Sequence, residues 1–332
     1  MSFKFKYAAR LNSFRVGEWG GRKPSTLDLI KRAATVEGLK AVDLNYPDHV
    51  EPHSVKEIAA SLRENGIELN GFAMRYYTEP DFKLGAFTHP NSMVRRSAID
   101  LTKRGIDCLS ALGGNLMTLW MGNDGYDYSF QADYNAQWQH TLEAMTEVAD
   151  HNKAVDISIE YKPNEPRSFA LMPGVATTLL AIKEIGRPNM GVTLDFAHVL
   201  YAGEMPAHAA QLIARYSKLL GLHLNDAYAK RDDGLMVAAV HPIQTLELLY
   251  VLPHLKYSGA IYFDTFPDIT GLDPVVECAT NIKTVERLAQ IAAGLRESKD
   301  LDEAIACQNA PASLAIINDA LYGPRLKELI KK

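Results

Sequence analysis

Carboxylate and imidazole side chains lie at or near the ends of four apolar segments between residues 157 and 264. They are Glu160, Asp195, His223 and Asp264, one for each segment. A single acidic residue at such a position commonly caps the next helix, and a single histidine is commonly a core residue. Four in succession indicate a shared site instead. Close-set buried carboxylates repel one another and take up protons unless a cation is present, so the set predicts a divalent metal ion.

Two further polar residues accompany this set. Lys162 lies two residues after Glu160, and His198 lies three residues after Asp195. Oxygen ligands combined with one or two imidazoles suit Mg²⁺, Mn²⁺ or Co²⁺ better than they suit a metal that prefers thiolates. Lys162 adds a positive charge that could stabilise a developing oxyanion.

Eight short apolar segments alternate with longer amphipathic ones, as in sheets whose strands are buried on both faces. We expect strands at residues 5–11, 41–45, 68–74, 115–121, 157–161, 191–195, 219–225 and 260–264. We expect helices at residues 25–36, 91–112, 138–151, 174–185, 207–219, 242–252 and 274–293. This alternation predicts an α/β fold, a (β/α)8 TIM barrel. A doubly wound open sheet is disfavoured because no glycine-rich phosphate loop follows the first strand.

The barrel determines where the polar residues meet and how the chain divides. Active sites of such barrels lie at the carboxyl ends of the strands, so the four residues should reach one rim. Residues 1–298 are expected to form the catalytic barrel domain. Residues 299–332 are expected to form a C-terminal helical extension that contacts a neighbouring subunit. The expected assembly is a homodimer or homotetramer.

The composition disfavours several other classes of protein. The chain has 332 residues, 47% of them hydrophobic, and a formal net charge of −5. Without a block of basic residues, a nucleic acid partner is not expected. No apolar run reaches the roughly 20 residues that span a membrane, and the N-terminal segment lacks the pattern of a signal peptide. With three well-separated cysteines, the chain is expected to be cytoplasmic.

Several motifs resemble known sugar isomerases. The segments at residues 159–167 and 194–198 resemble xylose isomerases, with the sequences IEYKPNEPR and LDFAH. Residues 83–100 and 223–237 resemble bacterial L-rhamnose isomerases of the same superfamily, with the sequences KLGAFTHPNSMVRRSAID and HLNDAYAKRDDGLMV. Residues 262–267, YFDTFP, resemble the strand-eight aspartate element of both families.

The resemblance implies two divalent metal ions, with Mn²⁺ preferred over Mg²⁺ or Co²⁺. Ligands of a structural metal, which also grips substrate hydroxyls, would be Glu160, Asp195, His223 and Asp264. Asp195 would bridge to a catalytic metal. The further ligands of that metal would be His198 with Asp232, Asp233 or both, because Gly234 replaces a third acidic residue of the rhamnose isomerases.

The resemblance also assigns roles around a sugar substrate. Lys162 would bind the substrate oxygen at C1, and Trp120 would form an apolar wall against the sugar carbons. The ring-opening residue stays open: His49 and His53 are ring-opening candidates, and both are equally well read as surface loop residues. Loop residues including Arg75, Tyr76 and Asp127 could line the pocket. Arg75 is the one hint of an anionic substituent.

The function expected from the motifs is that of a metal-dependent aldose–ketose isomerase acting on a free monosaccharide by a metal-assisted 1,2-hydride shift. The residues alone do not separate a hydride shift from an enediol route. The alternative is a ketose 3-epimerase that uses Glu160 and Asp264 as an acid/base pair around one metal. A metal-dependent endonuclease would need a basic face, and a non-catalytic sugar-binding protein would not need Lys162.

Overall fold

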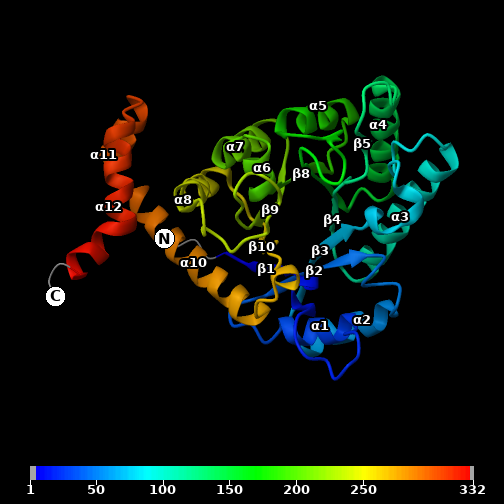
Figure 1. Ribbon diagram of the computed structural model, residues 1–332, viewed down its shortest axis with the longest axis horizontal. Coiled ribbons are helices and arrows are strands. Elements are labelled where there is room, and N and C mark those ends of the chain that lie inside the picture. Colours follow the sequence, from blue (N-terminus) through cyan, green and yellow to red (C-terminus); the bar gives the residue numbers. More distant parts are fainter. Residues whose placement is uncertain (1–4, 330–332) are drawn as a thin grey trace.

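The computed structural model describes residues 5–329. Within this range, eight parallel strands form a closed barrel (Figure 1). In chain order they are β1 (Tyr7–Arg10), β2 (Ala41–Tyr46), β3 (Glu68–Met74), β4 (Leu116–Leu119), β6 (Asp156–Glu160), β8 (Met190–Asp195), β9 (Leu219–Leu224) and β10 (Ile261–Phe263). The pairing of Tyr7 with Ile261 closes the ring between the first and last strands. The predicted TIM barrel is confirmed.

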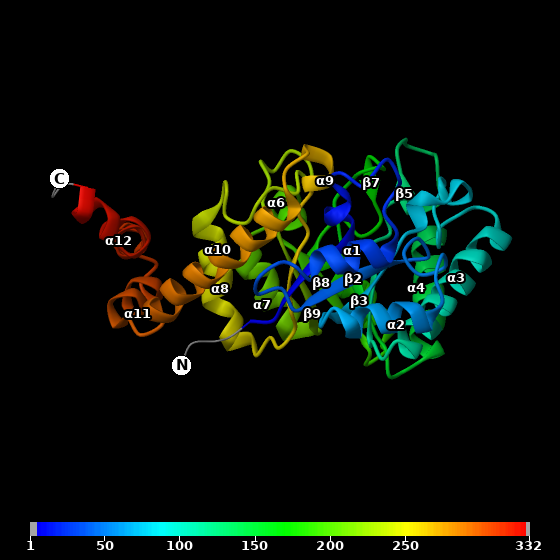
Figure 2. The same cartoon turned by 90° about the horizontal axis from the view of Figure 1, so that it is seen from below.

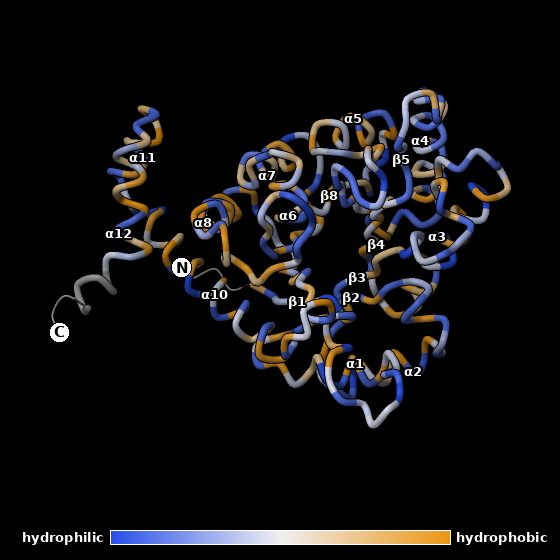
Figure 3. Tube along the Cα trace, in the orientation of Figure 1, coloured by the Kyte–Doolittle hydropathy of each residue, from blue (hydrophilic) through white to orange (hydrophobic). Residues whose placement is uncertain are grey.

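Helices alternate with these strands and surround the barrel in Figure 1. They are α1 (Thr26–Ala33), α2 (Val55–Glu64), α3 (Ser92–Ala111), α4 (Tyr134–His151), α5 (Val175–Ile185), α6 (Phe196–Tyr201), α7 (Pro206–Tyr216), α8 (Pro242–Val251), α9 (Pro267–Thr270) and α10 (Pro274–Leu295). Their apolar faces pack on the strands in one continuous core. Figure 3 shows such a concentration of hydrophobic residues in α8, which packs between α7 and α10.

Helix α2 has no counterpart among the helices expected from the sequence. Its start is nevertheless encoded locally. The Ser54 hydroxyl accepts a hydrogen bond from the backbone N–H of Glu57, and the Glu57 carboxylate accepts one from the N–H of Ser54. This reciprocal cap satisfies two backbone donors at the helix end. Val55, Ile58 and Leu62 also recur along α2 at helical spacing, so its apolar face is present in the sequence.

A small two-stranded sheet lies outside the barrel. It pairs β5 (Gly125–Tyr126) with β7 (Phe169–Ala170) in antiparallel fashion. Gly125 has a φ of +152°, and a Cβ atom there would lie 2.0 Å from the carbonyl oxygen of Phe169. Only glycine allows this close approach of the two strands. The pairing ties the loop after β4 to the loop after β6, on the rim where the polar residues gather.

The C-terminal helices extend away from the barrel. Figures 1 and 2 both show α11 (Lys299–Ala306) and α12 (Ala310–Leu329) beyond the end of α10, on one side of the molecule. Ile316, Ile317 and Leu321 of α12 are partly buried against the core, whereas Leu314 is exposed. The expected helical extension is therefore present, and residues 330–332 of it lie outside the described residues.

No helix within residues 5–329 combines the length and the apolar character needed to cross a membrane.

Candidate metal centre

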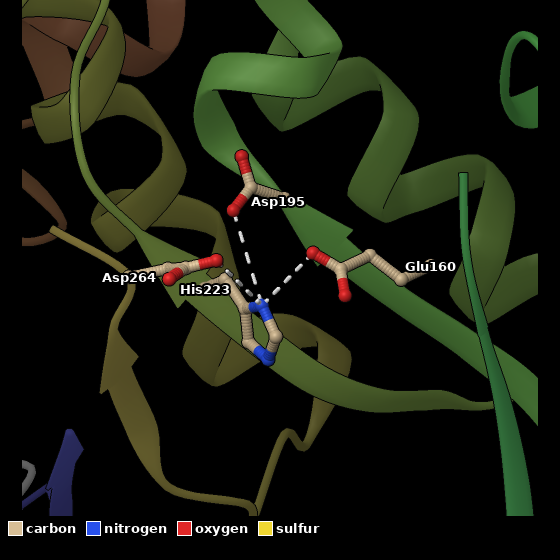
Figure 4. A group of neighbouring side chains, drawn as sticks. All are labelled: Glu160, Asp195, His223 and Asp264. Atoms are coloured by element: carbon tan, nitrogen blue, oxygen red, sulfur yellow. Dashed lines mark hydrogen bonds and ion pairs between the residues drawn. The ribbon is translucent and has the colours of Figure 1, made fainter. Parts of the chain in front are cut away.

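Four side chains from successive strands meet at the carboxyl end of the barrel (Figure 4). They are Glu160, Asp195, His223 and Asp264. One ligand atom of each lies within 4.8 Å of the corresponding atoms of the others. Figure 4 shows the three carboxylates directed at the imidazole, and His223 Nδ1 lies 3.1 Å from a Glu160 oxygen. Ligands on opposite sides of a small divalent ion are about 4.2 Å apart, so the spacing is close to that of a coordination shell.

Strand pairing brings these residues together. Asp195 and His223 are paired neighbours on β8 and β9, and Glu160 pairs with Thr193 on β8. Asp264 directly follows β10, which pairs with β9. Side chains from the ends of adjacent parallel strands must share one rim. The sequence prediction that these four residues form one group is therefore matched by the geometry of the barrel.

Asn225 holds the Asp195 carboxylate in place, a role that the sequence did not reveal. Its side-chain nitrogen donates to both Asp195 oxygens, at 3.1 and 3.3 Å. Asp195 also accepts a hydrogen bond from the backbone N–H of His198 and thereby caps α6. The Asp195 carboxylate thus both caps α6 and belongs to the group of candidate metal ligands. Such supporting contacts fix the orientation of metal ligands.

A second polar group lies beside the first and contains His198, Asp232 and Lys162. His198 Nδ1 lies 3.0 Å from the carbonyl oxygen of Tyr161, and its Nε2 lies 3.1 Å from an Asp232 oxygen. Lys162 Nζ lies 3.2 Å from the same oxygen. Since Nδ1 donates to the Tyr161 carbonyl, Nε2 is left to bind a proton or a cation next to Asp232. This is the arrangement of many histidine metal ligands.

The other oxygen of Asp232 supports the same conclusion. Asp232 Oδ1 is buried and has no hydrogen-bond partner among the described residues. A buried carboxylate oxygen without a partner is costly, and an additional ligand would satisfy it. On the other side of the imidazole, Asp195 Oδ1 lies 4.0 Å from His198 Nδ1, the ring nitrogen that faces the Tyr161 carbonyl. The residues present therefore suit a second divalent cation.

Asp233 points elsewhere. Its carboxylate accepts hydrogen bonds from the backbone N–H of Tyr228 and from the Arg231 guanidinium, and no contact within the described chain joins it to His198. The neighbouring Gly234 has a φ of +56°, and a Cβ there would lie 2.3 Å from the Phe266 ring. A third acidic residue at this position would collide with the wall of the site.

Burial and the attraction between the carboxylates and the cationic side chains shift pKa values across the whole centre. Burial lowers the pKa of His198 and of His223, but the surrounding carboxylates outweigh burial and raise both to about 9. Burial raises the pKa of Asp264 to about 7 and also raises that of Asp195. Burial lowers the pKa of Lys162 as well, yet Asp232 and Glu165 raise it above the ordinary value. In the absence of a metal ion, bound protons thus reduce the negative charge of the centre, and a metal ion would take over this role.

A cavity of about 270 Å³ opens on both polar groups. Residues from the metal centre line it, together with Arg10, Arg75, Tyr77, Trp120, Tyr262, Phe266 and Ile269. Trp120 lies one residue beyond β4, with Lys162 Nζ 5.2 Å from its ring centroid. Its ring packs edge-on against Tyr77 at 4.8 Å. The predicted apolar wall therefore exists, and Tyr77 and Phe266 extend it.

The loop residues that could line a pocket lie in different places. Arg75 lines the cavity, whereas Tyr76 is fully buried with its hydroxyl on Thr102 and Asp127 pairs with Arg167. His49, a candidate for ring opening, is buried rather than on the surface, and it is not among the residues that line the cavity. Its Nδ1 accepts from the backbone N–H of Asn45, and its Nε2 faces Asn12.

Comparison with known proteins assigns the family. Residues 30–293 match the family described as the xylose isomerase-like TIM barrel, and the chain belongs to this family. The xylose isomerase of Thermus thermophilus is 27% identical over 224 residues, which are 66% of this chain and 58% of the relative. The chain thus spans little more than half the length of that curated relative.

Solved structures share the fold at low sequence identity. An L-ribulose 3-epimerase superposes with a TM-score of 0.68 at 15% identity and covers 89% of this chain and 99% of its own. A D-psicose 3-epimerase from Clostridium cellulolyticum H10, determined with D-tagatose, gives a TM-score of 0.62 at 18% identity over 87% of this chain and 97% of its own. At these identities the comparison establishes the barrel alone.

Proposed function

We propose that the protein is a metal-dependent aldose–ketose isomerase that acts on a free monosaccharide by a 1,2-hydride shift. The observation that carries this proposal is the second polar group beside the first. Lys162 and His198 meet at one oxygen of Asp232 in the cavity wall, the other oxygen of Asp232 has no partner among the described residues, and Asp195 lies 4.0 Å from His198. A centre for two cations with an adjacent lysine provides what a C1–C2 isomerisation requires.

The metal ions, with Mn²⁺ preferred, would be held by the two groups that share Asp195. Glu160, His223 and Asp264 would complete the first group, and His198 and Asp232 the second. When bound, the ions supply Lewis acidity that orients the hydroxyls of the open chain and polarises its carbonyl group.

The reaction itself needs few other groups from the protein. An aldose becomes a ketose when the hydrogen on C2 moves with its bonding electrons to C1 and the proton of the C2 hydroxyl passes to O1. Lys162 stays charged, since its pKa is raised by Asp232 and Glu165 against the effect of burial, and it can donate to the oxygen at C1. Trp120 and Tyr77 shield the reacting carbons from water.

The test is an isotope experiment. Metal-stripped protein is incubated in D₂O, with and without Mn²⁺, with a panel of aldoses and ketoses that includes neutral sugars and sugars with a terminal carboxylate or phosphate, and products are followed by NMR. We expect Mn²⁺-dependent interconversion with little deuterium at C1 or C2. Interconversion with deuterium gain there would replace the hydride shift by an enediol route. Absence of any interconversion with Mn²⁺ present would disprove the proposed function.

The second candidate is a ketose 3-epimerase that uses Glu160 and Asp264 as its acid and base around one metal. It is favoured by the barrels of known ketose 3-epimerases, which superpose on most of this chain. The pKa of Asp264, raised to about 7 by burial, is also suitable for proton transfer near neutral pH. In the same NMR experiment, deuterium at C3 of a ketose with inverted configuration would identify this activity.

We further propose that the extension at residues 299–332 forms the contact of a cytoplasmic homodimer or homotetramer. Exposed apolar side chains support this: Ile305, Leu314 and Tyr322 are 52%, 46% and 47% exposed. Light scattering of the full chain and of a chain ending at residue 298 tests it. We expect the full chain to be an oligomer and the shortened chain to be a monomer. Identical masses for the two chains would contradict the proposal.

A further inference from the structure

Positive charge gathers on the part of the rim that carries no metal ligand. Arg10 is the last residue of β1, Arg15 ends the short 3₁₀ helix η1 (Leu11–Arg15), and Arg75 directly follows β3. Arg10 and Arg75 line the same cavity as the metal ligands. All three arginines act electrostatically on the buried His49, which lowers its pKa to about 3 together with the larger effect of burial. They therefore form one positively charged group.

The arginines differ in how their charge is compensated. Arg10 donates to Asp268 at 2.6 Å and lies 3.6 Å from Asp264. Arg75 forms no ion pair within the described part of the chain, and its buried Nε has no hydrogen-bond partner there. Asp48 and Asp264 act on it only from a distance. Burial, followed by repulsion from Arg10, lowers the pKa of Arg75 to about 10. A buried guanidinium without an ion pair is costly, and a bound anion would compensate its charge.

The contacts along the cavity wall place Arg75 relative to the reacting end. Lys162 Nζ lies 5.2 Å from the centroid of Trp120, whose ring lies 4.8 Å from that of Tyr77. The guanidinium of Arg75 in turn stacks on Tyr77 at 4.2 Å. The order along the wall is thus lysine, two aromatic rings and arginine. A sugar that packs on the rings with its carbonyl at Lys162 would direct its other end toward Arg75.

We propose that the substrate is an anionic sugar whose terminal phosphate or carboxylate is bound by Arg75. This inference rests on the proposed function for the position of the reacting end. Arg10 strengthens the positive field, but its pairing with Asp268 and Asp264 leaves Arg75 as the direct ligand. The planar guanidinium offers paired donors that match either anion. The stack on Tyr77 holds this plane in a fixed orientation.

The test uses sugar alcohols, which have no carbonyl group and so bind without being isomerised. Calorimetry of the Mn²⁺-loaded protein compares a hexitol, the same hexitol with a phosphate at the end distant from C1, and the compound with a carboxylate at that distant end, which is made by reducing the carbonyl group of the corresponding uronic acid. We expect a charged compound to bind roughly 10- to 100-fold more tightly than the neutral one, as for one or two charge-assisted hydrogen bonds. The phosphate and carboxylate arms show which anion the site takes. Equal binding of all three compounds would overturn the proposal.

Two variants make the test specific. Arg75→Met should remove the preference for the charged compound, and Arg75→Lys should restore part of the preference. The matched control is Arg215→Met, because Arg215 also stacks on an aromatic ring, Tyr216, but is exposed and lies on α7. A preference retained in Arg75→Met, or lost in Arg215→Met, would contradict the assignment.

A further measurement needs no variant. Binding of the charged compound to the wild-type protein should weaken as salt is added, whereas binding of the neutral hexitol should not. The two proposals can also fail separately. Isomerisation without any preference for charge would disprove only the anionic substrate, and charge-dependent binding without isomerisation would disprove only the isomerase.

Discussion

The two halves of the barrel rim carry opposite charge. The half built from β6, β8, β9 and β10 presents Glu160, Asp195, His223 and Asp264. The half built from β1 and β3 ends in Arg10 and Arg75. Both halves face one cavity of about 270 Å³. A ligand of this cavity therefore meets carboxylates with their ions at one end and a guanidinium at the other.

The comparison shows how a buried charge can be compensated by different means. In the metal half, protons on His198 and His223 neutralise the carboxylates, which is why both pKa values are raised to about 9 in spite of burial. In the arginine half, Asp268 compensates Arg10. Arg75 Nε and Asp232 Oδ1 have no hydrogen-bond partner within the described residues. These two groups mark the places where ligands are needed.

The largest effect is expected from Asp195→Asn, because this carboxylate is shared by the two proposed metal groups. Replacing it removes one charge from each group and should lower kcat/KM at least ~10³-fold, equivalent to several kcal/mol of lost charge stabilisation. Steady-state kinetics and Mn²⁺ titration check this. The control is Asp156→Asn at the opposite end of β6, where the carboxylate contacts Lys218. Similar losses in both variants would contradict the shared role of Asp195.

Lys162→Met tests the side chain that lies between Asp232 of the second polar group and the ring of Trp120. The change removes a buried cation while keeping side-chain length, and it should lower kcat roughly 10²- to 10³-fold, as for loss of one donor to a developing oxyanion. Mn²⁺ affinity should rise slightly or stay unchanged, because a positive charge next to Asp232 is lost. A variant that retains kcat and loses Mn²⁺ would show that Lys162 supports the metal site rather than the substrate.

The pH dependence of Mn²⁺ binding tests how protons and metal compete. The metal-free protein holds protons on His198 and His223 below about pH 9 and on Asp264 below about pH 7. Because the ion displaces these protons, its affinity should rise about tenfold per pH unit for each proton released, up to about pH 9. Calorimetry in buffers of different ionisation enthalpy counts the protons. An affinity independent of pH would mean that the imidazoles do not bind the ion.

The sequence predicts the fold and the metal half of the rim well, for a physical reason. Strands buried on both faces have apolar runs that are easily recognised, and the residue that ends each run must reach the rim. This places Glu160, Asp195 and Asp264 together before any coordinates are known. Helix α2 is absent from the expected helices although Val55, Ile58 and Leu62 recur along it at helical spacing.

The arginine half and the supporting contacts are harder to predict. Nothing in the local sequence distinguishes Arg75, which lines the cavity, from Tyr76, which points into the core. The role of Asn225 depends on a hydrogen bond to a residue on another strand. The buried His49 likewise forms a hydrogen bond with Asn12, far away in the sequence. Such roles follow from tertiary contacts and not from a pattern along the chain.

The smallest effect is expected from Asp233→Asn, although Asp232 and Asp233 are equivalent in the sequence. The Asp233 carboxylate contacts Arg231 and the backbone of Tyr228 and makes no described contact with the metal half, so its loss should change kcat/KM less than roughly threefold, in the range of an ion pair whose cation is exposed. Asp232→Asn is the matched comparison and should lower kcat/KM about 10²-fold or more, because it removes the partner of His198 and Lys162. If the two variants lose activity equally, both aspartates act on the second ion. If only Asp233→Asn loses activity, the loop at residues 226–235 rearranges when the ion binds.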